Sequence, residues 1–333
     1  MNAIGGENAK KTVGLIESDA LGDILVKENI KPASELSVSD NRSQLERFYC
    51  EVVPRANTKY GVSVHEMTVP TVDTEIGIPI TIYIPQNSPV VTPIMVYFHG
   101  GGYIMGSRNN VEDTCKILAV KAECCVVNVE YRLAPEHKFP ACYNDAKAAS
   151  YICCPSVFIW SYHSDVVVTE PGGMQRSIVG VAGDSAGGNI AAAVCHEVPG
   201  IAFQVLIYPL IDLTCKNESH KTYANGPVIS QKDMKFFLDN FLNKDEEKMN
   251  ARGSPIYRKS FQDIPPAMFI VAEIDPLKDD SHEYGKKIRE NGIKSKSLLI
   301  RGVVHGFFTL PGIFEKSCQK AYEEVVTFIK SQL

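Results

Sequence analysis

The sequence predicts an α/β fold in which a mostly parallel central sheet carries helices on both faces. From Pro93 onward, short and nearly continuous apolar runs alternate with helical patterns, which is typical of strands covered on both sides. With 333 residues and 44% hydrophobic content, the chain is long enough for one large core. The expected strands are Ile94–Phe98, Cys124–Val129, Ile178–Ala182, Phe203–Tyr208, Met268–Ile274 and Ser297–Ile300, and the expected helices are Asn110–Ala122, Ala141–Ile152, Gly188–Val198, Lys278–Asn291 and Glu315–Ile329.

The part of the chain before Pro93 has a different pattern. Apolar residues recur at helical spacing over Val13–Lys27 and again over Ser43–Val52. Two extended runs follow, and the alternation in the second suits a strand pair at the edge of the sheet. These runs are Val62–Pro70 and Ile78–Ile84.

One later segment, residues 211–255, interrupts the alternation of strands and helices. It contains a helical stretch, Lys232–Leu242, with aromatic residues on closely spaced turns. We therefore expect a core made of residues 61–210 and 256–333. Residues 1–60 and 211–255 are expected to fold over the top of the sheet as a helical cap.

Composition argues against several classes of partner. A formal net charge of -5 with both signs interspersed gives no electrostatic case for nucleic acid or anionic membrane. There is no apolar run long enough for a signal peptide or a membrane span. The ten cysteines show no CxxC pattern and no metal-ligand spacing with histidines. We expect a cytoplasmic protein with no cofactor, metal or stable membrane anchor, which binds a small molecule and forms a homodimer.

The pentapeptide Gly183–Gly187 fits the pattern G-x-S-x-G and lies between an expected strand and an expected helix. A serine at such a tight turn projects its hydroxyl above the sheet, and the flanking glycines let strand and helix pass closely. The pentapeptide alone is a weak signal, because small residues are common wherever a strand leads into a helix. A phosphate-binding loop does not fit, since the glycine spacing differs and no Gly-Lys-Ser/Thr follows. Ser185 is therefore the candidate nucleophile.

A glycine-rich stretch, His99–Gly102, closes the strand Ile94–Phe98. Acyl transfer develops negative charge on the carbonyl oxygen, and preorganised backbone N–H groups stabilise that charge strongly. Glycines allow the chain to approach a substrate and turn its amides inward. The N–H of Ala186, at the start of a helix, could complete such an oxyanion hole. His99 itself is expected to hold the loop by hydrogen bonds, and the alternative is a glycine-rich loop without function.

Four motifs in this order resemble the hormone-sensitive-lipase-like branch of the α/β-hydrolases, which includes bacterial esterases, arylacetamide deacetylases and plant carboxylesterases. They are Tyr97–Gly102, Glu130–His137, Gly183–Asn189 and Asp275–Leu277, and the resemblance extends from about Ile78 to the C-terminus. It implies an α/β-hydrolase fold with a helical cap, carboxylesterase or related activity, and no cofactor. The segment Cys153–Arg176 departs from the family by being longer and more apolar than the usual connection.

The resemblance also implies roles for single residues. It assigns the catalytic acid to Asp275 and the catalytic base to His305, which stands in a His-Gly-Phe segment. It assigns the oxyanion hole to the amides of Gly101, Gly102 and Ala186.

Chain order offers a separate route to the base, because the acid and then the histidine follow the serine in α/β-hydrolases. His196 lies on the expected helix Gly188–Val198, which directly follows Ser185. If it is set aside for that reason, three histidines remain after Ser185 in the chain. His220 lies in the inserted segment and His282 on a helix. His305 follows the strand Ser297–Ile300 in a loop with nearby glycines, which favours it as the base. The alternative is a loop histidine that caps the final helix.

Several carboxylates compete for the role of the acid. Asp275 comes directly after the strand Met268–Ile274, and Pro276 ends that strand by removing a donor. Carboxylates at the start of the next helix instead complement its dipole. We therefore prefer Asp275, with the role of orienting the imidazole. The competitors are Glu273, Asp279 and Asp280.

These residues lead to the hypothesis of a serine esterase for acyl chains of small to medium length, acting through an acyl-enzyme. Candidate pocket residues are Tyr103, next to the oxyanion glycines, and Phe236 and Phe237 on the inserted helix. Phe236, Phe237 and Phe241 can equally be cap core. Amide hydrolysis, lipase activity and a non-catalytic ligand receptor on the same fold are the alternatives, although such plant receptors lack the histidine that is present here.

Overall fold

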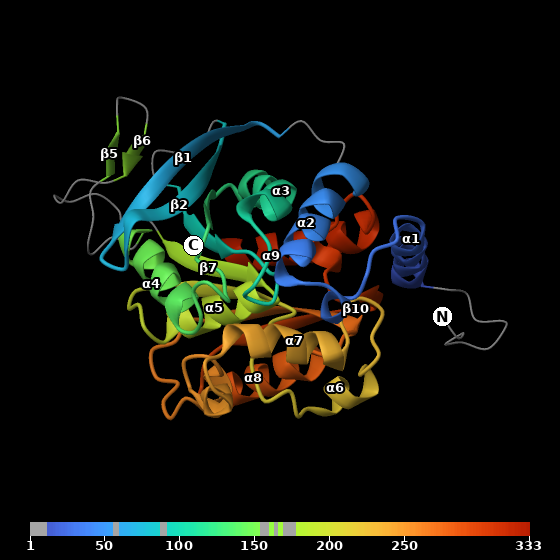
Figure 1. The fold of residues 1–333 in the computed structure, drawn as a ribbon. Coiled ribbons are helices and arrows are strands. Elements are labelled where there is room, and N and C mark those ends of the chain that lie inside the picture. Colours follow the sequence, from blue (N-terminus) through green and yellow to red (C-terminus); the bar gives the residue numbers. More distant parts are fainter. Residues whose placement is uncertain (1–11, 56–59, 87–91, 154–159, 163–165, 169–177) are drawn as a thin grey trace.

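A computed structural model of the chain describes residues 12–55, 60–86, 92–153, 160–162, 166–168 and 178–333. Its centre is an eight-stranded sheet in the order β1-β2-β4-β3-β7-β8-β9-β10 (Figure 1). From β4 to β10 all neighbours are parallel, whereas β1 and β2 pair antiparallel at one edge. The α/β-hydrolase fold is thus confirmed. The strands are β1 Val62–Thr71, β2 Thr74–Pro85, β3 Ile94–Phe98, β4 Cys125–Val129, β7 Val179–Asp184, β8 Phe203–Ile207, β9 Ala267–Ile274 and β10 Ser295–Val304.

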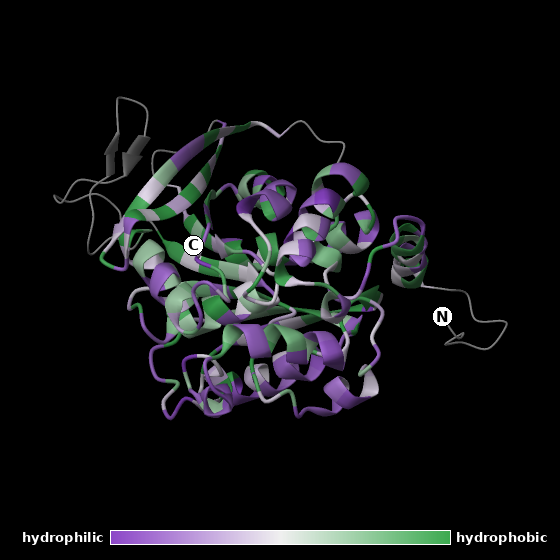
Figure 2. Ribbon diagram, viewed as in Figure 1, coloured by the Kyte–Doolittle hydropathy of each residue, from purple (hydrophilic) through white to green (hydrophobic). Residues whose placement is uncertain are grey.

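Helices cover both faces of this sheet and bury its apolar strands in two cores. One core packs the sheet against α4, α5 and α8, and the other packs it against α1, α3 and α9. Figure 2 shows the apolar residues concentrated on the central strands between these helices. The helices are α1 Val13–Lys27, α3 Glu112–Ala122, α4 Ala141–Cys153, α5 Ala186–Cys195, α8 Lys278–Glu290 and α9 Glu315–Lys330.

The second N-terminal helix begins earlier than its apolar pattern predicts. Helix α2 spans Val38–Arg47 and continues as a π-helical turn over Phe48–Val52. Its start is set by Ser37, whose hydroxyl accepts a hydrogen bond from the amide of Asp40 at 3.1 Å. The first turn is polar, so hydrophobic periodicity alone gave no signal there.

Strand β10 is also longer than predicted, because it continues past Ile300 to Val304. Its pairing with β9 shifts between Ile300 and Val304, and Gly302 in this irregular stretch has a φ of +77°. Such a bulge redirects a strand locally. Strand β10 ends at Val304 after this bulge, so His305 is the first residue of the loop that follows.

The inserted segment contains two helices, α6 (Glu218–Thr222) and α7 (Gln231–Phe241). Helix α7 begins with a capping box, in which Ser230 and Asp233 each satisfy the other's backbone amide. Within the unusual segment Cys153–Arg176, β5 (Trp160–Tyr162) and β6 (Val166–Val168) pair antiparallel. The remainder of that segment, after Cys153, lies outside the described residues. Among the described residues, no helix combines the length and apolarity needed to cross a bilayer.

Candidate active site

Ser185 stands at the sharp turn between β7 and α5 with a φ of +56° and a ψ of −118°. A non-glycine residue in this region is strained and persists only where its surroundings enforce it. The Ser185 amide donates to the carbonyl of Ile207 at 2.9 Å, which fixes the turn against β8. A Cβ atom on Gly187 would lie 2.0 Å from the carbonyl oxygen of Phe98, so the flanking glycine is required. This geometry is that of a nucleophile elbow.

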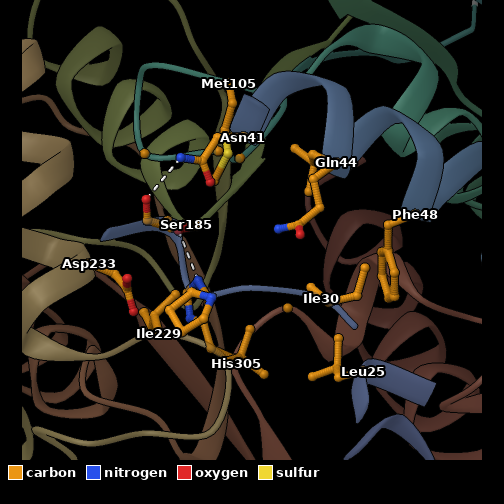
Figure 3. A pocket seen from close by; sticks show the side chains of 18 of the residues that line it. Leu25, Ile30, Asn41, Gln44, Phe48, Met105, Ser185, Ile229, Asp233 and His305 are labelled. Atoms are coloured by element: carbon orange, nitrogen blue, oxygen red, sulfur yellow. Dashed lines mark hydrogen bonds between the residues drawn. The ribbon is translucent and has the colours of Figure 1, made fainter. Parts of the chain in front are cut away.

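The structure brings Ser185, His305 and Asp275 into one hydrogen-bonded chain. Nε2 of His305 lies 2.9 Å from the Ser185 hydroxyl, and its Nδ1 lies 2.7 Å from Oδ2 of Asp275 (Figure 3 shows the first of these contacts). Oδ1 of Asp275 accepts from the amide of Leu277 at 2.8 Å, and the carboxylate is fully buried. Because a carboxylate can only accept, Nδ1 carries the proton and leaves Nε2 free to take one from the serine.

The competing histidines and carboxylates have other partners. His220 faces Asp280 in a buried pair, 3.4 Å apart, and Asp280 also accepts from the amides of Ile211 and Asp212. His282 lies beside Asp279 on α8. Glu273 accepts from the amide of Gly302 at 2.7 Å, which supports the bulge in β10. Each of these groups therefore has a local structural contact away from Ser185.

The glycine loop after β3 has a backbone that side chains would not tolerate. Gly101 has a φ of +121° and Gly102 a φ of +59°. A Cβ on Gly101 would lie 2.1 Å from the carbonyl oxygen of Met105, and one on Gly102 would lie 2.6 Å from the ring of Phe237. Among the described residues, the amides of Gly101, Gly102 and Ala186 donate to no acceptor. They therefore meet the requirement for a preformed oxyanion hole, which is a set of free donors.

Asp184 connects this loop to the elbow. Its Oδ1 accepts from the amide of Gly100 at 3.1 Å and from the hydroxyl of Tyr97 at 2.9 Å. Burial raises the pKa of Asp184 to about 6, although these hydrogen bonds oppose that shift. His99 completes the support, since its Nδ1 contacts the carbonyl of Gly100 at 2.8 Å and its ring stacks on Tyr131.

Ser185 and His305 open into a cavity of about 610 Å³, within the range of small-molecule sites. Figure 3 shows the labelled apolar side chains Leu25, Ile30 and Phe48 across this cavity from Ser185. Two sequence-distant segments close it over the core. The N-terminal segment supplies Leu21, Leu25, Ile30, Asn41, Gln44 and Phe48, the inserted segment supplies Pro227, Val228, Ile229, Asp233 and Phe237, and the core supplies Met105, Tyr208, Thr309 and Leu310.

Of the three predicted pocket residues, Phe237 lines the cavity, whereas Tyr103 and Phe236 are not among its lining residues. Tyr103 is only 1% exposed, and its ring stacks on Phe241 at 4.0 Å. Its φ of +66° turns the side chain from the glycine loop into the core under α7. Sequence reasoning placed residues 1–60 in a cap but named none of the lining residues of α1 and α2, because an apolar helical face looks the same whether it packs in a core or lines a cavity.

The fold and the geometry of this site are those of an α/β-hydrolase, and the comparison with known proteins gives the same class. Residues 95–309 match the family described as the α/β-hydrolase fold. The chain belongs to this family, and its resemblance to the hormone-sensitive-lipase-like branch is confirmed.

More particular similarities come from individual proteins. The chain is 32% identical to the carboxylic ester hydrolase LipN of Mycobacterium tuberculosis over 276 residues, which cover 79% of this chain and 69% of LipN. It is 27% identical to the ethyl acetate hydrolase of Pseudomonas putida, covering 86% of this chain and 88% of that one. The solved esterase of Pyrobaculum calidifontis superposes with a TM-score of 0.82 at 30% identity, covering 94% of this chain and 98% of the esterase.

Proposed function

We propose that this α/β-hydrolase is a carboxylesterase that hydrolyses small-molecule carboxylic esters by serine catalysis. The observation that carries the proposal is the hydrogen-bonded chain of Ser185, His305 and Asp275 at the base of a mostly apolar cavity. The relatives named as a carboxylic ester hydrolase and an ethyl acetate hydrolase support the same reaction.

In the first half of the reaction, Oγ of Ser185 attacks the ester carbonyl while Nε2 of His305 takes its proton. Charge develops on the carbonyl oxygen, which the free amides of Gly101, Gly102 and Ala186 stabilise. Asp275 holds the imidazole tautomer and stabilises the imidazolium without taking the proton. His305 then protonates the alcohol oxygen as the C–O bond breaks, which leaves an acyl-enzyme on Ser185.

In the second half, a water molecule repeats these steps on the acyl-enzyme. His305 takes a proton from the water, the hydroxide attacks the acyl carbon, and the same amides stabilise the second oxyanion. His305 returns its proton to Oγ of Ser185 as the carboxylic acid leaves. All groups required for this sequence belong to the chain itself, so the reaction needs no cofactor or metal.

We assign the cap to residues 1–60 and 211–255, because the described parts of both segments contribute to the cavity wall opposite the sheet. Residues 1–11 and 56–59 lie outside the described residues. The apolar wall favours esters with small to medium acyl chains over charged substrates. We further propose a cytoplasmic homodimer. Buried cysteines such as Cys115, Cys142 and Cys318 form no disulfide, which suits a reducing compartment. Among the described residues, β10 has a strand neighbour on one side only, which leaves an edge that a second copy could pair with.

The test is hydrolysis of p-nitrophenyl esters from acetyl to long acyl chains by the wild type and by Ser185→Ala. We expect activity that peaks at short to medium chains and falls by about 10⁵- to 10⁶-fold without the Ser185 hydroxyl. A fluorophosphonate should label the wild type and not the variant. A folded wild type that neither turns over any ester nor reacts with the fluorophosphonate would contradict the proposal and favour a non-catalytic receptor.

A further inference from the structure

Asn41, in the first turn of α2, is a buried polar residue that lines the catalytic cavity. It is only 2% exposed. Its Nδ2 donates to the carbonyl oxygens of Ala33 at 2.9 Å and Ser37 at 3.0 Å, with a longer contact of 3.4 Å to Leu36. These bonds tie the turn before α2 to the helix itself.

The same bonds fix which way the amide faces. All the partners are carbonyl oxygens, which require a donor, so the NH₂ end must point toward them and the oxygen must point away. Oδ1 of Asn41 accepts no hydrogen bond from the described residues, and it is not among the polar atoms sealed from solvent without a partner. The oxygen is therefore open to the cavity.

Two other polar side chains of this wall, Gln44 and Asp233, are engaged differently. Gln44, one turn further along α2, accepts from the amide of Lys31 and donates to the carbonyl of Lys31, both at 2.9 Å, so both ends of its amide are used. Asp233 accepts from Ser230 and from the amide of Ser34, which joins the two parts of the cap. Asn41 thus differs from Gln44 in offering the cavity an unused acceptor.

Asn41 also lies on the part of α2 that is attached to the glycine loop after β3, which contains Gly101 and Gly102. The next residue, Arg42, donates from Nε to the carbonyl of Ile104 at 2.7 Å and pairs with Glu136. Ile104 follows directly after the loop that contains Gly101 and Gly102. In Figure 3, Asn41 and Met105 are on the Ser185 side of the cavity, away from Leu25, Ile30 and Phe48.

We propose that Asn41 is a specificity-determining residue whose Oδ1 accepts a hydrogen bond from a hydroxyl or N–H group of the substrate. The preferred substrates are then esters that carry a hydrogen-bond donor near the scissile group and an apolar chain toward Leu25, Ile30 and Phe48. A site with a buried acceptor discriminates against an analogue that lacks the donor, because that acceptor is then left without a partner. This inference rests on the proposed esterase function.

The experiment compares matched ethyl esters in a pH-stat, each rate divided by the rate of hydroxide hydrolysis. Ethyl 3-hydroxybutanoate is paired with ethyl 3-methylbutanoate, ethyl lactate with ethyl isobutyrate, and ethyl N-acetyl-β-alaninate with its N-methyl counterpart. A further pair places the hydroxyl on the alcohol portion. In at least one pair the wild type should favour the donor by about 3- to 10-fold in kcat/KM.

Two variants separate recognition from structure. Asn41→Leu should bring that ratio close to unity, whereas Gln44→Met removes an amide from the same helix and should leave the ratio unchanged. A ratio near unity for every pair in the wild type would overturn the inference, as would a ratio that survives in Asn41→Leu. A wild-type ratio near unity overturns the inference even if Asn41→Leu does not fold, and Asn41→Ala is the second variant in which the ratio is then measured. If the wild type hydrolyses none of these esters, the result contradicts the proposed esterase function itself, which the comparison with Ser185→Ala tests separately.

Discussion

The base of the cavity and its opposite wall are stabilised in different ways. At the base, Asp275 is fully buried, Ser185 has a strained φ of +56°, and the glycine loop is fixed by Asp184. The wall is made mostly of apolar side chains from two separate segments, joined by contacts such as that between Ser34 and Asp233. Directional bonds and strained backbone permit few substitutions, whereas apolar packing permits many. Changes at the base should therefore affect the chemical step, and changes in the wall should affect substrate preference.

The largest expected effect in this comparison is that of Asp275→Asn. An asparagine can still contact Nδ1 of His305 with its oxygen or its NH₂ group, and the NH₂ contact favours the wrong imidazole tautomer. Without a negative charge the imidazolium is also less stable. We expect kcat to fall about 10⁴-fold, a loss of the size known for this substitution in a serine protease. The measurement is kcat for a short p-nitrophenyl ester.

Asp279→Asn is the matched control for Asp275→Asn. Asp279 lies four residues further along and accepts from the amide of Ser219, away from Ser185. Its replacement should change kcat by less than about 3-fold, as expected for a carboxylate outside the reacting geometry. Equal losses in the two variants would mean that Asp275 acts through the fold and not on His305.

The next effect concerns the backbone of the glycine loop. Gly102→Ala places a Cβ 2.6 Å from the ring of Phe237 at a φ of +59°, so the loop or the ring must shift. Displacing one oxyanion donor should lower kcat by about 10²- to 10³-fold. Gly292→Ala is the control, because its φ of +80° brings similar strain and nothing lies within 4 Å of its Cβ. If both variants keep full activity, the Gly102 amide is not part of the oxyanion hole.

The difference between base and wall also explains what the sequence could predict. At the base, the proposed nucleophile Ser185 stands in a short motif, Gly183–Gly187, whose glycines are needed for strand and helix to pass closely. Asp275 and His305 follow strands, so their position at the sheet edge follows from topology. The wall has no such motif. In the sequence, Leu25, Ile30 and Phe48 cannot be told from core residues. Tyr103 was predicted as a wall residue, but with a φ of +66° its side chain lies in the core.

A smaller effect should appear in the pH dependence of stability, through Asp184. Its pKa is raised to about 6 by burial, so between pH 3.8 and 6 the native state holds a proton that the unfolded state has lost. This contribution to the free energy of unfolding therefore decreases as pH rises through that window. In Asp184→Asn it is absent, so the variant should gain stability relative to wild type over this window by at most about 3 kcal/mol.

The measurement is denaturant unfolding of both proteins from pH 4 to pH 8. The amide of the variant must find a new acceptor near Tyr97 and Gly100, and the cost of doing so does not depend on pH. The test is therefore how the difference in unfolding free energy between the two proteins changes with pH, and not the size of that difference at any one pH. Parallel curves would show that Asp184 has an ordinary pKa.

The smallest effect comes from two neighbouring residues on α7 that differ in their place relative to the wall. Phe237 lines the cavity, is 5% exposed and packs against Gly102, whereas Phe236 is half-buried and is not a lining residue. Phe237→Ala removes wall surface beside the oxyanion loop and should lower kcat/KM for a butyrate ester by about 10-fold. Phe236→Ala should change it by less than about 3-fold. Measuring kcat/KM from acetate to octanoate separates the two roles, because Phe237→Ala should also move the optimum to bulkier acyl groups. If both variants keep the wild-type profile, Phe237 does not contact the acyl chain.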